Sequence, residues 1–149
     1  MRDSLGGIPI LAIVTVFIVV ALGYMAFNVN YTKAFRMKNK VIDILEIYGG
    51  PVKCSSSVNC KRAIKNYSNE IGYSTGGKIS CPSGNNYGQF ENLFCWKRIP
   101  SDASGLDEGS SYSTYEISTK INIDIPIIRN FVVNISSFYV NGQTSPIKD

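Results

Sequence analysis

Four cysteines are the residues of this chain best suited to chemistry, because thiols form disulfides or bind zinc. The spacings Cys54-x5-Cys60 and Cys81-x13-Cys95 differ from the short pairs of a zinc ribbon, and the chain has no histidine to complete a mixed site. An even number of cysteines favours two disulfides over four free thiols, which implies an oxidising compartment. Three pairings are possible, and we adopt the sequential one, Cys54 with Cys60 and Cys81 with Cys95, as the working hypothesis.

Other constellations of reactive side chains are not evident in the sequence. The absence of histidine removes the commonest general base and the commonest metal ligand. Asp102, Asp107 and Glu108 lack the ligand spacing of a calcium loop. A net charge of +4 is too small for a typical nucleic-acid-binding face. We therefore predict no enzymatic activity, no metal or cofactor, and no nucleic-acid partner.

Residues 8–27 form an apolar stretch that is long enough to cross a membrane. The stretch, IPILAIVTVFIVVALGYMAF, has no charged side chain. At about 1.5 Å per residue it matches the roughly 30 Å of a bilayer's hydrocarbon core. A cleaved secretory signal is the alternative, but its apolar core is about 7 to 15 residues long and ends in small residues. We predict a transmembrane helix with membrane lipid as a partner.

Residues 28–48 continue this helix with an amphipathic pattern. The segment has no proline or glycine, and Gly49-Gly50-Pro51 is a typical helix end. Its apolar residues recur at steps of three and four, which predicts one covered face. These residues are Tyr31, Ala34, Phe35, Val41, Ile42, Leu45 and Tyr48.

Residues 49–149 are predicted to form a small α+β domain packed on the amphipathic half of the helix. We expect a short helix over about 60–71 and an exposed polar loop over 101–111. Alternation of apolar and polar residues over 115–125 predicts a half-buried strand that ends at Pro126. The other expected strands lie at 78–81 and 94–99, flanking a loop over 82–93, and at 131–140 with an extension over 142–147. The predicted fold is a long N-terminal helix, half transmembrane and half amphipathic, on a small antiparallel sheet with two disulfides.

The order of these parts resembles a type IV pilin or pseudopilin. A short polar leader, Arg2-Asp3-Ser4-Leu5-Gly6-Gly7, precedes the apolar helix. The resemblance implies cleavage by a prepilin peptidase between Gly7 and Ile8, with residues 1–7 as leader. Ala12 stands where the family usually has a glutamate. The C-terminal segment, INIDIPIIRNFVVNISSFYVNGQTSPI, is similar to TadE-type minor pilins of tight-adherence systems.

The resemblance implies a subunit of a bacterial surface pilus or secretion pseudopilus, with other pilins, or further copies of this chain, as partners. It implies a single-pass protein of the bacterial inner or plasma membrane, with its C-terminal domain outside. The helix would pack against neighbouring subunits through one face. We assign to this assembly face Ile10, Val14, Phe17, Ala21, Tyr31, Phe35, Ile42 and Leu45.

Two alternatives stay open at this point. The helix could simply tether an extracellular binding module that does not polymerise, and a large exposed aromatic patch would favour that function. The charges flanking the apolar stretch also oppose the outside placement. Lys33, Arg36, Lys38 and Lys40 follow it, whereas Arg2 precedes it, so the positive-inside rule predicts a cytoplasmic domain.

Overall fold

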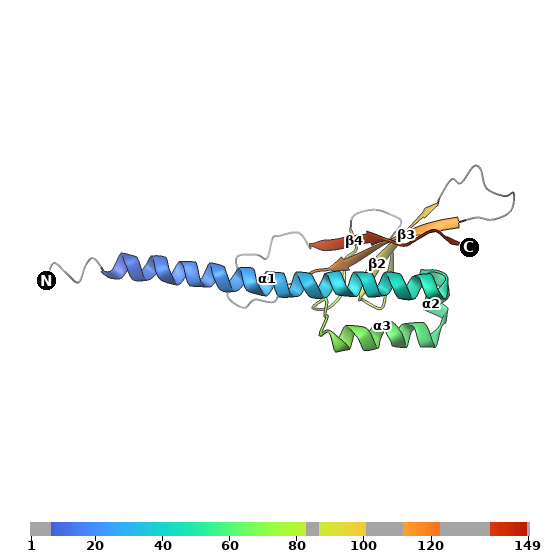
Figure 1. Ribbon diagram of the computed structural model, residues 1–149, viewed down its shortest axis with the longest axis horizontal. Coiled ribbons are helices and arrows are strands. Elements are labelled where there is room, and N and C mark those ends of the chain that lie inside the picture. Colours follow the sequence, from blue (N-terminus) through green and yellow to red (C-terminus); the bar gives the residue numbers. More distant parts are fainter. Residues whose placement is uncertain (1–6, 83–86, 101–111, 123–137, 149) are drawn as a thin grey trace.

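The computed structural model describes residues 7–82, 87–100, 112–122 and 138–148. Helix α1 (Gly7–Tyr48) forms the long axis of the molecule, and the domain packs on its C-terminal half (Figure 1). There α1 lies between the β-sheet on one side and helix α3 (Val58–Glu70) on the other. The N-terminal half of α1 extends out of the domain. This arrangement confirms the predicted α+β fold.

Helix α1 runs for 42 residues without a break, as the sequence predicts. It ends in a pair of glycines with positive φ, Gly49 at 75° and Gly50 at 104°. The amide of Gly50 donates to the carbonyl of Leu45 over 2.8 Å, which is the long closing bond of a Schellman motif. A side chain at either glycine would be strained in this conformation. The glycine pair therefore turns the chain back toward the domain.

A short helix that the sequence did not predict follows directly after Gly50. Helix α2 (Pro51–Ser56) begins at Pro51, where the missing amide proton costs nothing. Ser57 separates α2 from α3, and its side chain accepts a hydrogen bond from the amide of Cys60 over 3.4 Å. Helix α3 thus begins at Val58, two residues before the predicted start, because Ser57 caps it.

The sheet is antiparallel, with the strand order β1-β2-β3-β4 and β5 paired with β3. Trp96 on β2 lies opposite both Gly88 on β1 and Ile117 on β3. A Cβ at Gly88 would come within 2.4 Å of the Trp96 ring, so glycine is needed there. The strands are β1 (Tyr87–Phe90), β2 (Phe94–Pro100), β3 (Tyr112–Lys120), β4 (Tyr139–Gln143) and β5 (Ile147–Lys148).

Two strand predictions near the second cysteine pair are wrong. Residues 78–81 are not a strand, because side-chain bonds and a disulfide hold them beside the sheet. Tyr87–Phe90, predicted as loop, is a strand because Glu91 and Asn92 adopt positive φ, 43° and 58°, and turn the chain back into β2. Neither residue is glycine, so the sequence gives little sign of this turn.

The bounds of the later strands also differ from the prediction. Strand β3 begins at Tyr112 and ends at Lys120, whereas alternation predicted 115–125. The buried side of the predicted alternation is confirmed, since Tyr115, Ile117 and Thr119 are buried. The exposed side is not confirmed throughout, because Ser118 is fully buried as well. The predicted loop 101–111, Pro126 as a strand end and the run 131–137 lie outside the described residues.

The core joins α1 to the sheet and to α3. From α1 it includes Ala34, Met37, Val41, Ile44 and Leu45, all nearly or fully buried. Opposite them lie Phe94, Ile117 and Val140 from the sheet and Ile64 from α3. The Thr119 hydroxyl lies 3.0 Å from the carbonyl oxygen of Ala34 and donates to it. The C-terminal half of α1 is therefore also the central element of the domain.

We expect Leu45→Ala to lower the free energy of unfolding by about 2 to 5 kcal/mol, because it leaves a cavity in a packed core. Ile47→Ala is the matched control on the same turn. Ile47 is 79% exposed, so its truncation should change stability by less than about 0.5 kcal/mol. Denaturant unfolding of the full chain in detergent measures both. Equal losses in the two variants would contradict this packing.

Candidate functional site

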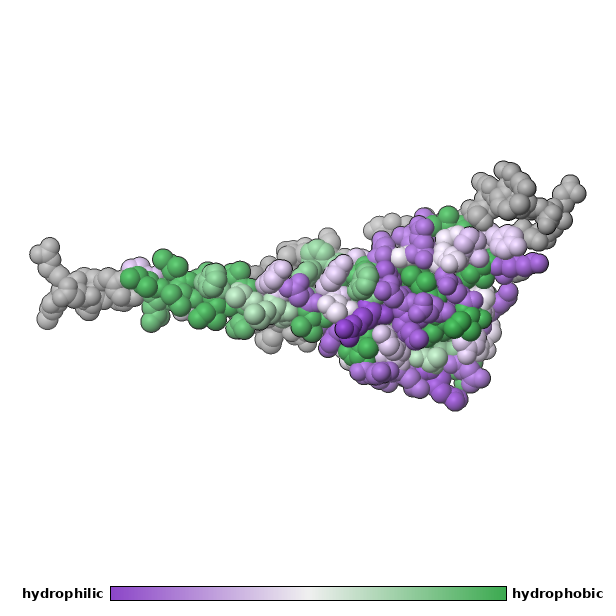
Figure 2. Space-filling view, viewed as in Figure 1, coloured by the Kyte–Doolittle hydropathy of each residue, from purple (hydrophilic) through white to green (hydrophobic). Residues whose placement is uncertain are grey.

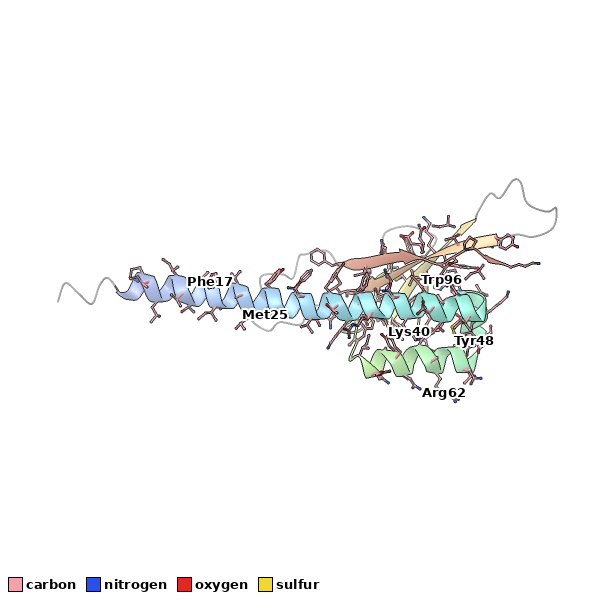
Figure 3. The ribbon with its side chains drawn as sticks, viewed as in Figure 1. Phe17, Met25, Lys40, Tyr48, Arg62 and Trp96 are labelled. Atoms are coloured by element: carbon pink, nitrogen blue, oxygen red, sulfur yellow. A yellow bond between two sulfur atoms is a disulfide. The ribbon has the colours of Figure 1, made fainter. Side chains whose placement is uncertain are left out.

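The N-terminal half of α1 presents a continuous apolar surface that the chain itself does not cover. Ile10 is 65% exposed and Phe17 is 72% exposed. Figure 2 shows this surface as a green stem beside the mostly purple domain. Phe17 and Met25 project from the part of α1 that lies outside the domain (Figure 3). By length and composition, α1 is able to cross a membrane, which supports a single-pass anchor.

The predicted assembly face is divided between this free surface and the domain core. Tyr31 and Phe35 are 43% and 41% exposed and so remain open to a partner. Ile42 packs partly against the core, and Leu45 is fully buried within it. The prediction is wrong for Leu45, because its side chain faces this chain's own core and cannot reach another copy. The predicted residues in the N-terminal half of α1 are exposed or partly exposed: Ile10, Val14, Phe17 and Ala21.

The predicted cleavage point lies in the first turn of α1, since the helix begins at Gly7 and continues through Ile8. Leader residues 1–6 lie outside the described residues. Cleavage between Gly7 and Ile8 stays a prediction.

An aromatic ladder follows the apolar stretch along α1. Phe27, Tyr31 and Phe35 stack at steps of four residues, with ring centroids 6.3 and 6.4 Å apart. Phe138 meets Phe27 edge-on at 6.2 Å, and the Lys38 ammonium lies 4.4 Å from the centre of the Phe35 ring. Aromatic rings followed by cations are typical of the boundary between a bilayer and water.

A cleft of about 530 Å³ opens beside this boundary, between α1 and the C-terminal end of α3. Its polar lining carries two cations, Lys33 and Arg36, and one carboxylate, Glu70. The Lys33 ammonium donates to the carbonyl of Gly72 over 3.2 Å, which joins α1 to the end of α3. The sequence reading placed Lys33 and Arg36 on a solvated helix face and could not bring Glu70 to them, because α3 is distant in the chain.

All four cysteines are paired, Cys54 with Cys60 and Cys81 with Cys95, in the sequential arrangement. The first disulfide joins α2 to α3 and is fully buried. The second ties the segment before β1 to the start of β2, with Cys81 partly exposed. Both therefore fix chain segments that have few backbone bonds to the sheet.

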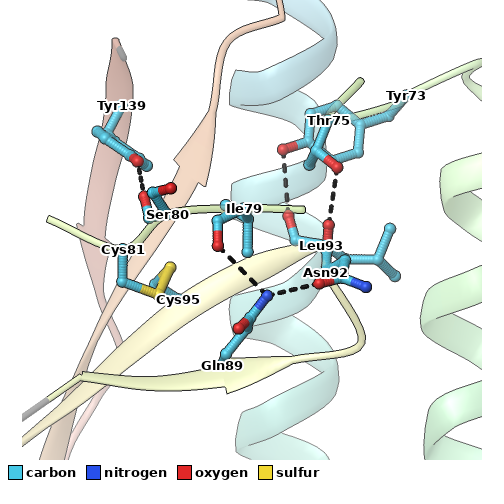
Figure 4. The surroundings of a disulfide bond; sticks show 10 residues. All are labelled: Tyr73, Thr75, Ile79, Ser80, Cys81, Gln89, Asn92, Leu93, Cys95 and Tyr139. Carbon is cyan, nitrogen blue, oxygen red and sulfur yellow. Dashed lines mark hydrogen bonds between the residues drawn. A yellow bond between two sulfur atoms is a disulfide. The ribbon is translucent and has the colours of Figure 1, made fainter. Parts of the chain in front are cut away.

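Buried hydroxyls hold the segment that links α3 to the second disulfide (Figure 4). The Tyr73 hydroxyl lies 2.9 Å from the carbonyl oxygen of Lys120 and 3.1 Å from that of Leu93. Thr75 donates to the carbonyl of Asn92 over 2.8 Å, and Tyr139 donates to the carbonyl of Ser80. Burial raises the pKa of Tyr73 well above its ordinary range. These groups are structural, since each bonds to backbone carbonyls.

Among residues 7–82, 87–100, 112–122 and 138–148, no three histidine, cysteine, aspartate or glutamate side chains gather closely enough to hold a metal ion. The predicted absence of a metal, a cofactor and enzymatic activity stays a prediction.

Comparison with known proteins found no matching family model and no significant similarity to a curated protein or a solved structure. The resemblance to TadE-type pilins therefore stays a prediction, and the function must be argued from the geometry described above.

We expect Tyr73→Phe to lower the free energy of unfolding by about 1 to 3 kcal/mol, because two buried carbonyls lose their shared donor. At a pH between the ordinary pKa of tyrosine and the raised pKa of Tyr73, the folded chain keeps the phenol proton and the unfolded chain has released it. The stability from this group is therefore complete below about pH 10 and falls as the pH rises further. Tyr73→Phe should flatten that fall in denaturant unfolding followed across alkaline pH. Tyr31→Phe, at a 43% exposed site, is the control, and an equal effect there would contradict the assignment.

The disulfides also predict where the domain lies. If it is outside the cytoplasm, cells quenched with acid and treated with a polyethylene-glycol maleimide should show no shift of the chain without reductant, and a full shift after reduction. Cys81→Ser leaves Cys95 unpaired and should give a single shift without reductant, which controls for reagent access. Four reactive thiols in the native chain would place the domain in the cytoplasm.

Proposed function

We propose that this chain is a membrane-anchored, pilin-like subunit of the TadE type, which assembles through α1 into a bacterial surface pilus or secretion pseudopilus. Three features support the proposal. The N-terminal half of α1 is apolar and uncovered, the domain beyond it is small and disulfide-bonded, and the order of the parts resembles that of pilins.

The rigid joint between the helix and the domain is the observation that carries the proposal. No linker separates them, because Ala34, Met37 and Val41 of α1 are core residues of the domain. The bond from Thr119 to Ala34 fixes the sheet on the helix backbone. In a filament held together by its helices, this joint would determine where every domain faces. A simple tether has no need of it, since a flexible linker serves equally well.

The exposed half of α1 would exchange one apolar environment for another on assembly. In the membrane its side chains contact lipid, and in a filament they would contact neighbouring helices. Since lipid tails are as apolar as the side chains, packing rather than the hydrophobic effect would drive the exchange. Ala21 lies on the predicted assembly face and is small enough to let two helices approach closely.

A tethered binding module is the second candidate. Large apolar side chains are exposed at the end of the domain farthest from the apolar stem, where α1 ends and α2 and α3 begin (Figure 1). Ile47 is 79% exposed and Val58 is 69% exposed. Such side chains are suited to contact another protein. This function requires no contact between copies of α1.

We propose an outside placement of the domain. Its support is the pair of disulfides, which persist in oxidising compartments. The cations that follow the apolar stretch favour the opposite orientation, so the thiol-trapping experiment described above decides between them.

Photocrosslinking tests assembly directly. With Phe17 replaced by p-benzoylphenylalanine in the full chain, illumination of bacterial membranes should give a ladder of covalent multimers, because Phe17 would contact a neighbouring helix. The matched control carries p-benzoylphenylalanine in place of Val16. Val16 is 63% exposed but lies about 100° around the helix from Phe17.

A strong ladder from position 17 and a weak one from position 16 would support assembly through the predicted face. Lipid adducts alone at both positions would contradict it and favour the tethered module. A fraction sheared from cells provides a second measurement, since filaments should carry the crosslinked chains into it.

A further inference from the structure

The cleft between α1 and α3 lies beside the end of the apolar stretch. Asn28, which follows that stretch directly, and Thr32 belong to its lining. Arg36 marks the upper end of the cleft on α1, about 12 Å beyond Asn28 at about 1.5 Å per residue. The headgroup region of a bilayer is roughly 5 to 7 Å thick on each side. With residues 8–27 in the hydrocarbon core, the end of the cleft at Asn28 and Val29 lies at the level of the lipid headgroups, and the backbone of Lys33 and Arg36 lies about 9 and 14 Å above the core.

Within the described part of the chain, the charged groups of this cleft have few partners. Among the residues that the structure describes, Lys33, Arg36 and Glu70 form no ion pair. Lys33 gives one hydrogen bond to the carbonyl of Gly72, which leaves two of its three donors. Because the side chains of a helix lean toward its N-terminus, the long side chains of Lys33 and Arg36 are able to reach back toward the membrane.

The lining is also apolar where an acyl chain or glycerol would pass. Val29 on α1 and Ile71 at the end of α3 contribute apolar surface. Val29 is 55% exposed and lies on the turn below Lys33. The cleft thus combines an apolar wall next to the membrane with paired cations and one carboxylate above it.

We propose that this cleft binds the headgroup of phosphatidylethanolamine while α1 lies in the membrane, with the phosphate held by Lys33 and Arg36 and the ammonium held by Glu70.

The arrangement of charge favours this lipid over the other common headgroups. Two cations suit a phosphate, and Arg36 offers the planar pair of donors that binds phosphate oxygens well. The Glu70 carboxylate complements a primary ammonium, which donates hydrogen bonds that the quaternary ammonium of phosphatidylcholine lacks. An anionic headgroup such as phosphatidylglycerol offers Glu70 no cation to pair with.

Photolabelling in vesicles tests the proposal. The full chain is reconstituted in phosphatidylcholine vesicles containing a trace of phosphatidylethanolamine with a photoreactive diazirine near the glycerol. Matched phosphatidylcholine and phosphatidylglycerol probes are used in parallel. Labelling of peptides that contain residues 28–36 and 70–72 is measured by mass spectrometry and divided by the labelling of residues 9–27, which reports insertion alone. We expect this ratio to be highest for phosphatidylethanolamine.

Two variants test the assigned contacts. Arg36→Gln should lower the ratio for phosphatidylethanolamine about tenfold, as expected for the loss of one charge-assisted contact. Glu70→Gln should remove the preference over phosphatidylcholine while leaving phosphate binding in place. Lys40→Gln and Asp43→Asn change exposed charges of α1 that do not line the cleft, and neither should alter the ratio.

Equal ratios for the three probes, or unchanged ratios in Arg36→Gln and Glu70→Gln, would overturn the proposal. Soluble glycerophosphoethanolamine distinguishes the source of the headgroup. If it abolishes labelling at low concentration, the ligand is a free phosphodiester and not a membrane lipid, which also overturns it.

This inference rests on the membrane-anchored part of the proposed function and not on filament assembly. Selective lipid labelling without crosslinks between copies would support the lipid site and reject the pilin role. Crosslinks without a lipid preference would support the pilin role and reject the lipid site.

Discussion

The rest of the structure depends on the continuity of one helix across the boundary between lipid and water. Inside a bilayer every backbone polar group must be satisfied within the chain, and α1 meets this requirement through its own hydrogen bonds. The same unbroken ladder carries Ala34, Met37 and Val41 into the core of the domain. Because one rigid element serves both parts, the domain would have a fixed height and direction relative to a membrane that α1 spans.

That shared element explains how the remaining parts are stabilised. With α1 occupied on one face by the sheet and on another by α3, the segments between them have few ladder bonds of their own. Disulfides and side-chain hydroxyls hold these segments in place instead. Cys54–Cys60 joins α2 to α3, and Cys81–Cys95 with Tyr73 and Thr75 fixes the segment after α3 against the sheet. Covalent and polar links thus hold what a small core cannot.

The part of α1 between the apolar stem and the domain core carries residues on which both proposals rest. The aromatic ladder of Phe27, Tyr31 and Phe35 leads from the apolar stem to the cations of the cleft. Below it the side chains are suited to lipid or to other helices, and above it they are suited to headgroups and water. Assembly through the stem and lipid binding at the cleft would use adjacent but separate surfaces of α1.

Local sequence patterns were enough to predict the elements whose signal lies in neighbouring residues. Three such signals are the length of the apolar stretch, the glycine at position 49 that follows the end of α1, and the alternation of Tyr115, Ile117 and Thr119. The structure agrees with each of them. Which apolar residues of the predicted covered face enter the core depends on how α1 packs against the sheet and α3. This packing buried Leu45 and left Phe35 partly exposed, and it brought Glu70 to Lys33 and Arg36. Helical periodicity cannot tell which of several neighbouring apolar residues will be buried. Charges on separate elements meet only when those elements pack, because such contacts depend on positions far apart in the chain.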